Sequence, residues 1–301
     1  MSSKTPSVRP LLRRSLLSVP AINARALSKA PGLDCDAIIF DLEDSVAPEK
    51  KGQARDNLVR LFADAWPGHH ERIIRVNAVE GADFAEDIKA VIACRPDALL
   101  LPKVGEPDEL QAASDALSVG GLGDVPLMAM METAQGILNA AAIARWGVAG
   151  ARLSAFVVGL NDLRKETGVL PDVKRTYLVP WLMQIVLAAR AHGIDVIDSV
   201  SNDFQELDAF RLECEQGRAM GFDGKMLIHP AQIEPANEAF GPTADGIAAA
   251  EAIVAAFADP AAEGLNVVNA GGRMIERLHL DEAERLLSKA KIIAQRKGIK
   301  A

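Results

Sequence analysis

Short runs of apolar residues recur along the chain, and each is followed by a stretch with helical patterning. The runs are apolar throughout instead of alternating, which is typical of parallel strands buried on both faces. They cover residues 14–20, 36–43, 72–77, 98–104, 126–133, 153–159, 194–200 and 224–229. The stretches between them begin as helices do; SVAPEKKGQARDNLVRLF, for example, carries Pro48 and Glu49 in its first turn. Eight strands alternating with helices over about 240 residues predict a (β/α)₈ TIM barrel.

A doubly wound open sheet is the alternative to a barrel. Such a sheet would place a glycine-rich phosphate-binding turn after its first strand. The residues at that point, SVPAINAR at 18–25, contain no glycine. The barrel is therefore the favoured architecture.

The strand signal stops near residue 241. We therefore predict a barrel domain at 1–241 and a C-terminal helical cap at 242–301. Within the cap, 241–259 is expected to form a helix, and NVVNAGGRM at 266–274 a glycine-rich loop. A final amphipathic helix is expected over 280–298, with acids first and bases last, as the helix dipole prefers.

Composition and charge narrow the function. The 301 residues are 49% hydrophobic and 25% charged, as in ordinary soluble globular proteins. The net charge of −8 argues against nucleic acid as a partner, because phosphate neutralisation needs a basic surface. No apolar run reaches the roughly 18 residues that a membrane span requires. Three scattered cysteines without a CxxC pair fit a reducing compartment, so we expect a cytoplasmic protein without membrane partners.

The segment AIIFDLEDSV at 37–46 places Asp41, Glu43 and Asp44 directly after a buried strand. An unpaired buried charge costs several kcal/mol, so a cation must hold these acids. Arg75 is the expected partner: Glu43 or Asp44 would hold its guanidinium while the remaining donors bind a substrate carboxylate. A purely structural ion pair is the alternative.

Polar residues gather where the predicted strands end, which is where TIM barrels carry their chemistry. These residues are Asp41, Glu43, Asp44, Arg75, Asn77, Lys103, Glu132, Thr133, Asn161, Asp162, Asp198, Ser199 and His229. The starts of the strands carry far fewer of them. This asymmetry predicts an enzyme.

Glu132 and Asp162 follow adjacent predicted strands at the same level of the barrel. Two carboxylates with room for water suit Mg²⁺, which binds few protein carboxylates together with substrate oxygens. Alternatively, each acid caps the helix that follows it. Lys103 is expected either to form a structural ion pair or to contact substrate. His229, followed by Pro230, is expected to fix a loop and not to act as a base.

The FDLEDS segment is also similar to the strand-end motif of haloacid-dehalogenase phosphatases. Those enzymes need an Asp-x-Asp pair, and here the third position is Glu43. No matching lysine and acidic pair accompanies the motif, so this interpretation is disfavoured.

Seven motifs taken together resemble those of citrate lyase β-subunit-like proteins, which belong with malyl-CoA and citramalyl-CoA lyases in the HpcH/HpaI aldolase family. In order, they are RRSLLSVP, IIFDLEDSVAPEKK, RIIRVNA, LLLPKV, METAQGILNAAAIA, GLNDL and GFDGKMLIHPAQI. The resemblance spans roughly residues 12–240. It implies a Mg²⁺-dependent barrel enzyme that cleaves or forms a carbon–carbon bond beside a CoA thioester.

The resemblance also implies roles for individual residues. Glu132 and Asp162 would ligate Mg²⁺, and Arg75 would bind the keto-acid portion of the substrate. Arg75, Glu43 and Asp44 would form the catalytic set, the two acids orienting the arginine, and Lys103 and Glu132 would also contact substrate. The expected reaction splits malyl-, citramalyl- or citryl-CoA into a keto acid and an acyl-CoA. The alternatives are a related lyase or thioester hydrolase without a CoA substrate, and a keto-acid-binding protein without turnover.

One departure from the family concerns the cap. Lyases of this group often carry an aspartate just before a G-[K/R]-M-I stretch, supplied to a neighbouring subunit's site; here the stretch is NAGGRMIE and the position is Gly271. Slower lyase turnover is expected as a result. The resemblance further implies a homo-oligomer, a trimer or its multiple, in which each cap covers a neighbour. Ile247, Ile253, Val254 and Phe257 are too many apolar residues for a solvated tail.

Overall fold

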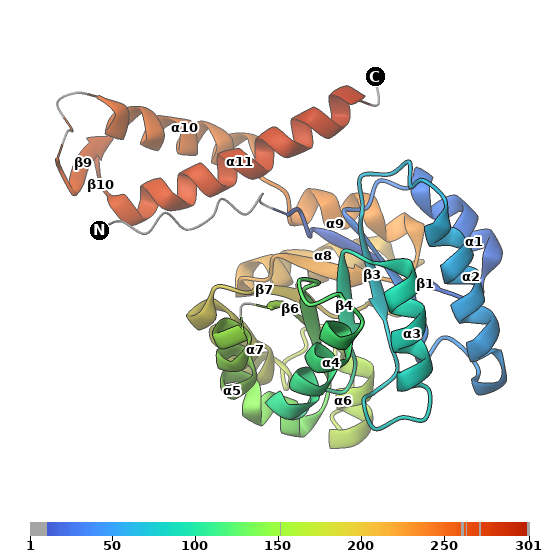
Figure 1. Ribbon diagram of the computed structural model, residues 1–301. Helices are drawn as coiled ribbons and strands as arrows, with labels where there is room; N and C mark the ends of the chain where they lie inside the picture. Colours follow the sequence, from blue (N-terminus) through green and yellow to red (C-terminus); the bar gives the residue numbers. More distant parts are fainter. Residues whose placement is uncertain (1–10, 151, 260–261, 263, 271, 300–301) are drawn as a thin grey trace. The chain divides into compact units, whose positions relative to one another are not determined.

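The computed structural model describes residues 11–150, 152–259, 262, 264–270 and 272–299. Eight parallel strands close into a barrel in the order β1 to β8 (Figure 1). They are β1 Ser15–Pro20, β2 Ala37–Asp41, β3 Glu71–Arg75, β4 Ala98–Leu101, β5 Leu127–Met131, β6 Leu153–Val158, β7 Asp195–Asp198 and β8 Gly224–Leu227. The predicted TIM barrel is confirmed, and the doubly wound open sheet is excluded.

Helices cover the outside of the ring of strands (Figure 1). They are α1 Ala24–Lys29, α2 Lys51–Ala63, α3 Phe84–Cys94, α4 Pro107–Val119, α5 Ala134–Gly150, α7 Val179–His192, α8 Leu207–Met220 and α9 Ile233–Ala239. A further short helix, α6 Leu160–Thr167, follows β6 directly and ends at Gly168, whose φ of 73° suits glycine. No helix among the described residues is long and apolar enough to cross a membrane.

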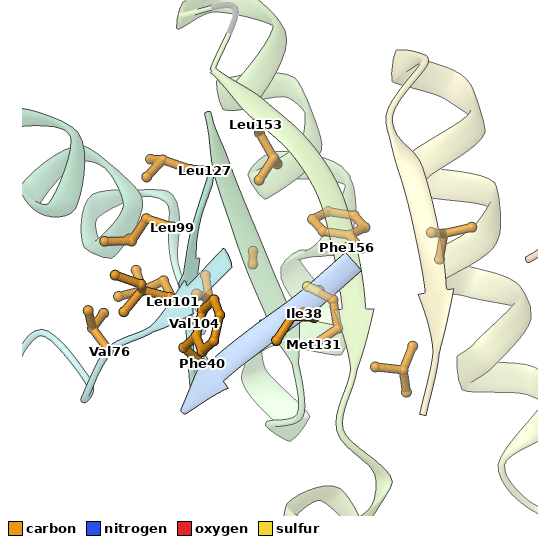
Figure 2. Close-up of a cluster of buried hydrophobic side chains, with 14 of the residues drawn as sticks. Ile38, Phe40, Val76, Leu99, Leu101, Val104, Leu127, Met131, Leu153 and Phe156 are labelled. Atoms are coloured by element: carbon orange, nitrogen blue, oxygen red, sulfur yellow. The ribbon is translucent and has the colours of Figure 1, made fainter. Parts of the chain in front are cut away.

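The barrel has two apolar layers, one inside the ring of strands and one between the strands and the helices. Alternation along β2 sends Ala37 and Ile39 into the inner layer and Ile38 and Phe40 into the outer one. Figure 2 shows part of the outer layer, where Ile38 and Phe40 lie in the same cluster as Phe156 of β6. Because both faces of each strand are buried, the strands are apolar throughout in the sequence.

The N-terminal end of the barrel is closed by a buried ion cluster. Arg13, which is 4% exposed, donates from Nε and Nη2 to the carboxylate of Glu71 at 2.8 and 2.6 Å. Its Nη1 donates to Asp195 at 3.0 Å and to the backbone of Ser154 at 3.2 Å. The charges of Arg13 and Glu71 are thus paired within the protein, as expected of the face of a TIM barrel that serves stability.

The chain divides into two compact units, the barrel Arg13–Phe240 and a smaller unit that includes the residues from Gly241 on. The smaller unit contains α10 Ala244–Ala258, β9 Val267–Ala270, β10 Arg273–Glu276 and α11 Arg277–Ile299, so both helices expected here are confirmed. α10 packs against α11. Ile247, Ile253, Val254 and Phe257 are half-buried in α10, so they do not by themselves require a neighbouring subunit.

The expectation of a glycine-rich loop over 266–274 is wrong. β9 and β10 pair as an antiparallel hairpin, with Met274 opposite Asn269. Gly272 has a φ of 79°, and its amide donates to the side chain of Asn269 at 3.0 Å. Short apolar flanks on either side of a Gly-Gly pair are a hairpin signal that the helical surroundings obscured. Gly271 lies outside the described residues.

Closure of the barrel between β8 and β1 depends on a glycine. A Cβ on Gly224 would lie 1.8 Å from the carbonyl oxygen of Arg13. The obstacle is backbone that the parallel pairing of β1 with β8 holds in place. We therefore expect Gly224→Ala to lower the free energy of unfolding by about 3 kcal/mol or more, measured by denaturant unfolding.

Gly52→Ala is the matched control for this substitution. Gly52 is exposed near the start of α2, and a Cβ there would meet nothing within 4 Å. The same added methyl group should leave stability unchanged or raise it by up to about 1 kcal/mol. Equal stability of the two variants would contradict this account of barrel closure.

Candidate functional site

A cavity of about 440 Å³ opens at the C-terminal ends of the strands. This volume lies within the roughly 300–1,000 Å³ usual for small-molecule sites. Of the residues predicted for the site, Asp44, Arg75, Glu132 and Asp162 line the cavity. Glu43 and Lys103 reach it through their contacts with these residues.

Arg75 pairs with Glu43 as predicted, but its main partner is Asp41, which was not predicted for this role, and Asp44 does not hold it. Its Nε and Nη2 donate to the two oxygens of Asp41 at 2.6 and 2.7 Å, and Nη1 lies 3.2 Å from Glu43. Asp41 and Arg75 are opposite each other in the pairing of β2 with β3, and both point inward. Asp44 lies beyond the strand and faces Lys103, at 3.5 Å. Strand parity and pairing therefore select Asp41.

The ion pair also fixes the charge state of Asp41. Burial would raise the pKa of Asp41, but the charge and hydrogen bonds of Arg75 outweigh burial and lower the pKa. The carboxylate additionally accepts the backbone amides of Glu43 and Ser45, at 3.0 and 3.2 Å. Asp41 thus holds both the guanidinium and the turn that carries Glu43.

The turn after β2 is held from its other side by buried Lys51, the last residue of the IIFDLEDSVAPEKK motif, to which no role was assigned from the sequence. Lys51 donates from Nζ to the carbonyl oxygens of Leu42 and Glu43, at 2.8 and 2.9 Å, and to Asn77, at 2.7 Å. Burial raises the pKa of Glu43, against the opposing effect of the charges of Arg75 and Lys103. Glu43 therefore lies between two cations without being fully stabilised as an anion.

Lys103 connects the two groups of acids at the mouth. Its backbone has a φ of 55°, in the left-handed region that non-glycine residues rarely adopt. In this conformation its amide donates to Glu132 at 2.8 Å while its Nζ donates to Glu43 at 2.7 Å. The ion pair is thus present, and the side chain remains 40% exposed, enough to meet a ligand as well.

Glu132 is a buried carboxylate with little to balance its charge. It is 1% exposed, and among the described residues it accepts one hydrogen bond, from the backbone of Lys103. It does not cap the following helix, since Thr133 accepts the amide of Gly136 at 2.9 Å, so the capping alternative is wrong for Glu132. Burial, together with the negative charge of Glu43, raises the pKa of Glu132 to about 8. A carboxylate in such a place favours a bound cation.

Asp162 lies in the first turn of α6 and lines the same cavity as Glu132. The residue before α6 is Gly159, and a Cβ there would lie 2.3 Å from Oε2 of Glu132, so glycine lets the two segments meet. Two carboxylates facing a cavity large enough for water fit Mg²⁺. Within the described ranges, no group of three or more His, Cys, Asp or Glu side chains is placed to hold a metal, so an ion here would complete its shell with water or substrate oxygens.

Other residues at the mouth were not predicted or were given less weight. Lys165 lines the cavity one turn after Asp162, and this spacing in a predicted helix is a signal that could have identified it. Asn161 and Asn202 exchange hydrogen bonds of 3.2 and 2.8 Å across the rim. His229 accepts the amide of Ala231 at 3.2 Å, which fixes its loop as expected.

The side chains of Asp198 and Ser199, at the end of β7, point to opposite sides of the barrel wall. Ser199 lines the cavity, whereas Asp198 points to the outer side of the strand, where it pairs with Arg175. Asp198 was expected at the mouth with the other strand-end residues, and this expectation is wrong. Adjacent residues of a strand face opposite sides of the sheet, so only one of the two can reach the site.

The state of Glu132 leads to a prediction on pH and metal. Because the folded metal-free protein binds this proton more tightly than the unfolded chain, its stability should fall as pH rises from about 4.5 to about 8. Glu132→Gln keeps the shape and the acceptor but removes this fall. The variant should melt at or above the wild-type temperature at pH 8.5, and Mg²⁺ should raise the melting temperature of the wild type but not that of Glu132→Gln.

Glu71→Gln is the control, because Glu71 is a buried glutamate of the opposite end of the barrel. Its loss leaves Arg13 without its main partner, so the variant should lose about 3 kcal/mol or more while still responding to Mg²⁺. Stabilisation of Glu132→Gln by Mg²⁺ to the wild-type extent would contradict the metal assignment.

Comparison with known proteins places this site in a family. A family model described as HpcH/HpaI aldolase/citrate lyase matches residues 14–230. The (3S)-malyl-CoA thioesterase of Cereibacter sphaeroides is 45% identical over 281 residues, covering 93% of this chain and 95% of that protein. The mitochondrial citramalyl-CoA lyase of Homo sapiens is 32% identical over 296 residues, covering 94% and 87%.

Among solved structures, CitE of Mycobacterium tuberculosis in complex with magnesium, acetoacetate and coenzyme A is similar, with a TM-score of 0.71 and 27% identity. The match covers 94% of this chain and 100% of that chain. These similarities agree with the resemblance carried by the seven sequence motifs. The chain belongs to the HpcH/HpaI aldolase/citrate lyase family.

Proposed function

We propose that the chain is a Mg²⁺-dependent enzyme that acts on a short 3-hydroxyacyl-CoA thioester of the malyl-CoA kind, and that it hydrolyses the thioester. The observation that carries the proposal is Glu132, a buried carboxylate short of positive charge, which lines one cavity with Asp162 and Arg75. The likeness to solved structures with bound magnesium, acetoacetate and coenzyme A supports the same ligand classes for this chain.

In this proposal the acyl group is held by its hydroxy-acid end. Glu132 and Asp162 hold Mg²⁺, which when bound supplies Lewis-acid polarisation of the substrate oxygens. Arg75 binds the free carboxylate, oriented by its two bonds to Asp41. Lys103 contributes a second, partly exposed positive charge at the rim.

For hydrolysis, water adds to the thioester carbonyl carbon and the carbon–sulfur bond breaks. The thioester carbon becomes a carboxylate of the released hydroxy acid, and the sulfur leaves as the CoA thiol after it takes up the proton that the attacking water has lost. We assign proton transfer from water to Asp44, an exposed carboxylate that lines the cavity and pairs with Lys103. Charge that develops on the thioester oxygen is stabilised by the cations at the mouth.

Two observations favour thioester hydrolysis over carbon–carbon cleavage. The 45% identity to a (3S)-malyl-CoA thioesterase extends over nearly the whole of both chains. In addition, Gly271 stands where the lyases that the chain resembles carry an aspartate, and carbon–carbon cleavage needs an acid to protonate the enolate carbon that it leaves.

Carbon–carbon cleavage is the second candidate, favoured by the similarity to citramalyl-CoA lyase. In that reaction the substrate hydroxyl loses its proton, the carbon–carbon bond breaks, and its electron pair forms the thioester enolate. A 2-oxo acid leaves, and the enolate carbon gains a proton to give the acyl-CoA. The implied homo-oligomer, a trimer or its multiple, in which the C-terminal unit completes a neighbour's site, stays a prediction.

The two reactions release different products from one substrate. With (3S)-malyl-CoA and Mg²⁺, we expect free CoA thiol to appear and no 2-oxo acid, with activity lost in EDTA and restored by Mg²⁺. Release of a 2-oxo acid without free thiol would instead establish the lyase. If neither product forms while the ester still binds, the chain is a binding protein and the proposal fails.

Arg75→Lys should lower kcat/KM by about 100-fold or more, because a point charge cannot keep the two bonds to Asp41 and also bind a carboxylate. The control is Arg55→Lys: Arg55 also bonds two carboxylates, Asp83 and Asp87, but on the outside of the barrel. Steady-state kinetics of both variants decide the point. Equal losses in the two would show that Arg75 has a structural role alone.

A further inference from the structure

A second ion cluster lies behind the barrel wall, on the side of β7 away from the cavity. Asp198 is fully buried, and both of its oxygens accept from Nη1 of Arg175, at 2.7 and 2.8 Å. Lys225 of β8, also fully buried, donates to the same carboxylate at 3.0 Å. These three charged groups take no part in the site described above.

Helix α8 completes this cluster. Lys225 donates to Glu213 at 2.6 Å, and Nε of Arg175 donates to Gln216 at 2.9 Å. A Cβ on Gly217 would lie 2.9 Å from Asp198, so the helix backbone approaches the carboxylate closely. The charges of the two cations, Arg175 and Lys225, balance those of Asp198 and Glu213. Asp198 is bonded by Arg175, from the segment before α7, and by Lys225 of β8, and the backbone of α8 packs closely against it.

Burying such a cluster costs desolvation free energy that its ion pairs seldom exceed, so apolar side chains of the same volume would stabilise the fold as well or better. What the charges add is a defined geometry. The geometry passes to the next residue: Asp198 accepts the amide of Ser199 at 2.8 Å, and Ser199 points to the opposite side, into the cavity.

Ser199 in turn holds the start of α6. Its hydroxyl oxygen accepts the amide of Leu160, the first residue of that helix, at 3.0 Å. The residue before the helix, Gly159, has no side chain to supply a cap, and it must be glycine because Glu132 lies against it. The serine of the next strand therefore supplies the acceptor that the helix cannot supply for itself.

We propose that Asp198, held by Arg175 and Lys225, and Ser199 are positioning residues that fix the first turn of α6 and, through it, the direction of Asp162. The chain of contacts runs from the outer layer of the barrel through the wall to the candidate metal site. The inference rests on the proposed function only in taking Asp162 as a metal ligand.

Ser199→Ala tests the last link of this chain. We expect hydrogen exchange in the first turn of α6 to become at least tenfold faster in the metal-free protein, because one amide loses its acceptor. The affinity for Mg²⁺, measured by calorimetry without substrate, should fall by about 10-fold or more, as when a group that orients a metal ligand is removed.

Ser15→Ala is the matched control. Ser15 is as buried as Ser199, and its hydroxyl accepts the amide of Asp36 at 3.0 Å and donates to Asn237 at 2.7 Å, at the opposite end of the barrel. The control should lose thermal stability to a similar degree, with exchange in α6 and Mg²⁺ affinity as in the wild type. A Ser199→Ala variant that behaves like Ser15→Ala in both readouts would overturn the inference.

The ion cluster is tested by Arg175→Met, with Arg13→Met as the control at the N-terminal end. Exchange in α6 should become faster in the first variant alone, and an equal effect in both would overturn the role of the cluster. If Arg175→Met does not fold, the comparison of Ser199→Ala with Ser15→Ala still tests whether Ser199 positions α6. Faster exchange in Ser199→Ala with unchanged Mg²⁺ affinity would support the positioning of α6 and overturn Asp162 as a ligand, which separates this inference from the proposed function.

Discussion

The two-bond ion pair between Asp41 and Arg75 is the contact on which the arrangement of the barrel mouth depends. It joins β2 to β3 at the last paired position of both strands, where the apolar interior gives way to the cavity. Burying two charges is costly, and the geometry must be close to ideal for the attraction to offset that cost. Here one edge of the guanidinium donates two hydrogen bonds to Asp41. The same carboxylate accepts the backbone amides of Glu43 and Ser45, in the turn that follows β2. The remaining donors of Arg75 and the positions of Glu43 and Lys103 follow from this pair.

The acids of the mouth differ in how fully they are balanced, and this difference separates their roles. Asp41 has a complete set of donors, so its pKa is lowered despite burial. Glu43 pairs with two cations, Arg75 and Lys103, but burial outweighs their effect and its pKa is raised. Glu132 has one backbone donor, and its pKa rises to about 8. A structural network would have balanced all three, and the unbalanced one is the carboxylate that lies beside Asp162 in the cavity.

The two ends of the barrel show the same contrast. At the N-terminal end Arg13 is paired with Glu71 and Asp195. At the C-terminal end the buried carboxylate of Glu132 forms no ion pair within the part of the chain that the structure describes. Lys103 has a left-handed backbone there, and a cavity opens to solvent. Strain and unbalanced charge are costs that a fold carries where they serve binding or chemistry. The chain that carries this mouth is similar both to a (3S)-malyl-CoA thioesterase and to a citramalyl-CoA lyase.

The sequence alone determined the barrel, because strands buried on both faces leave runs that are apolar throughout, and eight of them alternate with helices. It also indicated which strand ends carry the polar residues, and with them Arg75, Glu132 and Asp162. Only the tertiary structure decided that Asp41 is the main partner of Arg75, because the choice among neighbouring acids depends on which of them points inward and which pairs across the sheet. The hairpin of β9 and β10 was also missed, because its strands are only four residues long and stand between helical stretches that obscured the signal of the two glycines. Asp198 and Ser199 are adjacent in the chain yet lie on opposite sides of the wall, since the pleat of a strand, and not proximity in sequence, assigns each side chain to a face.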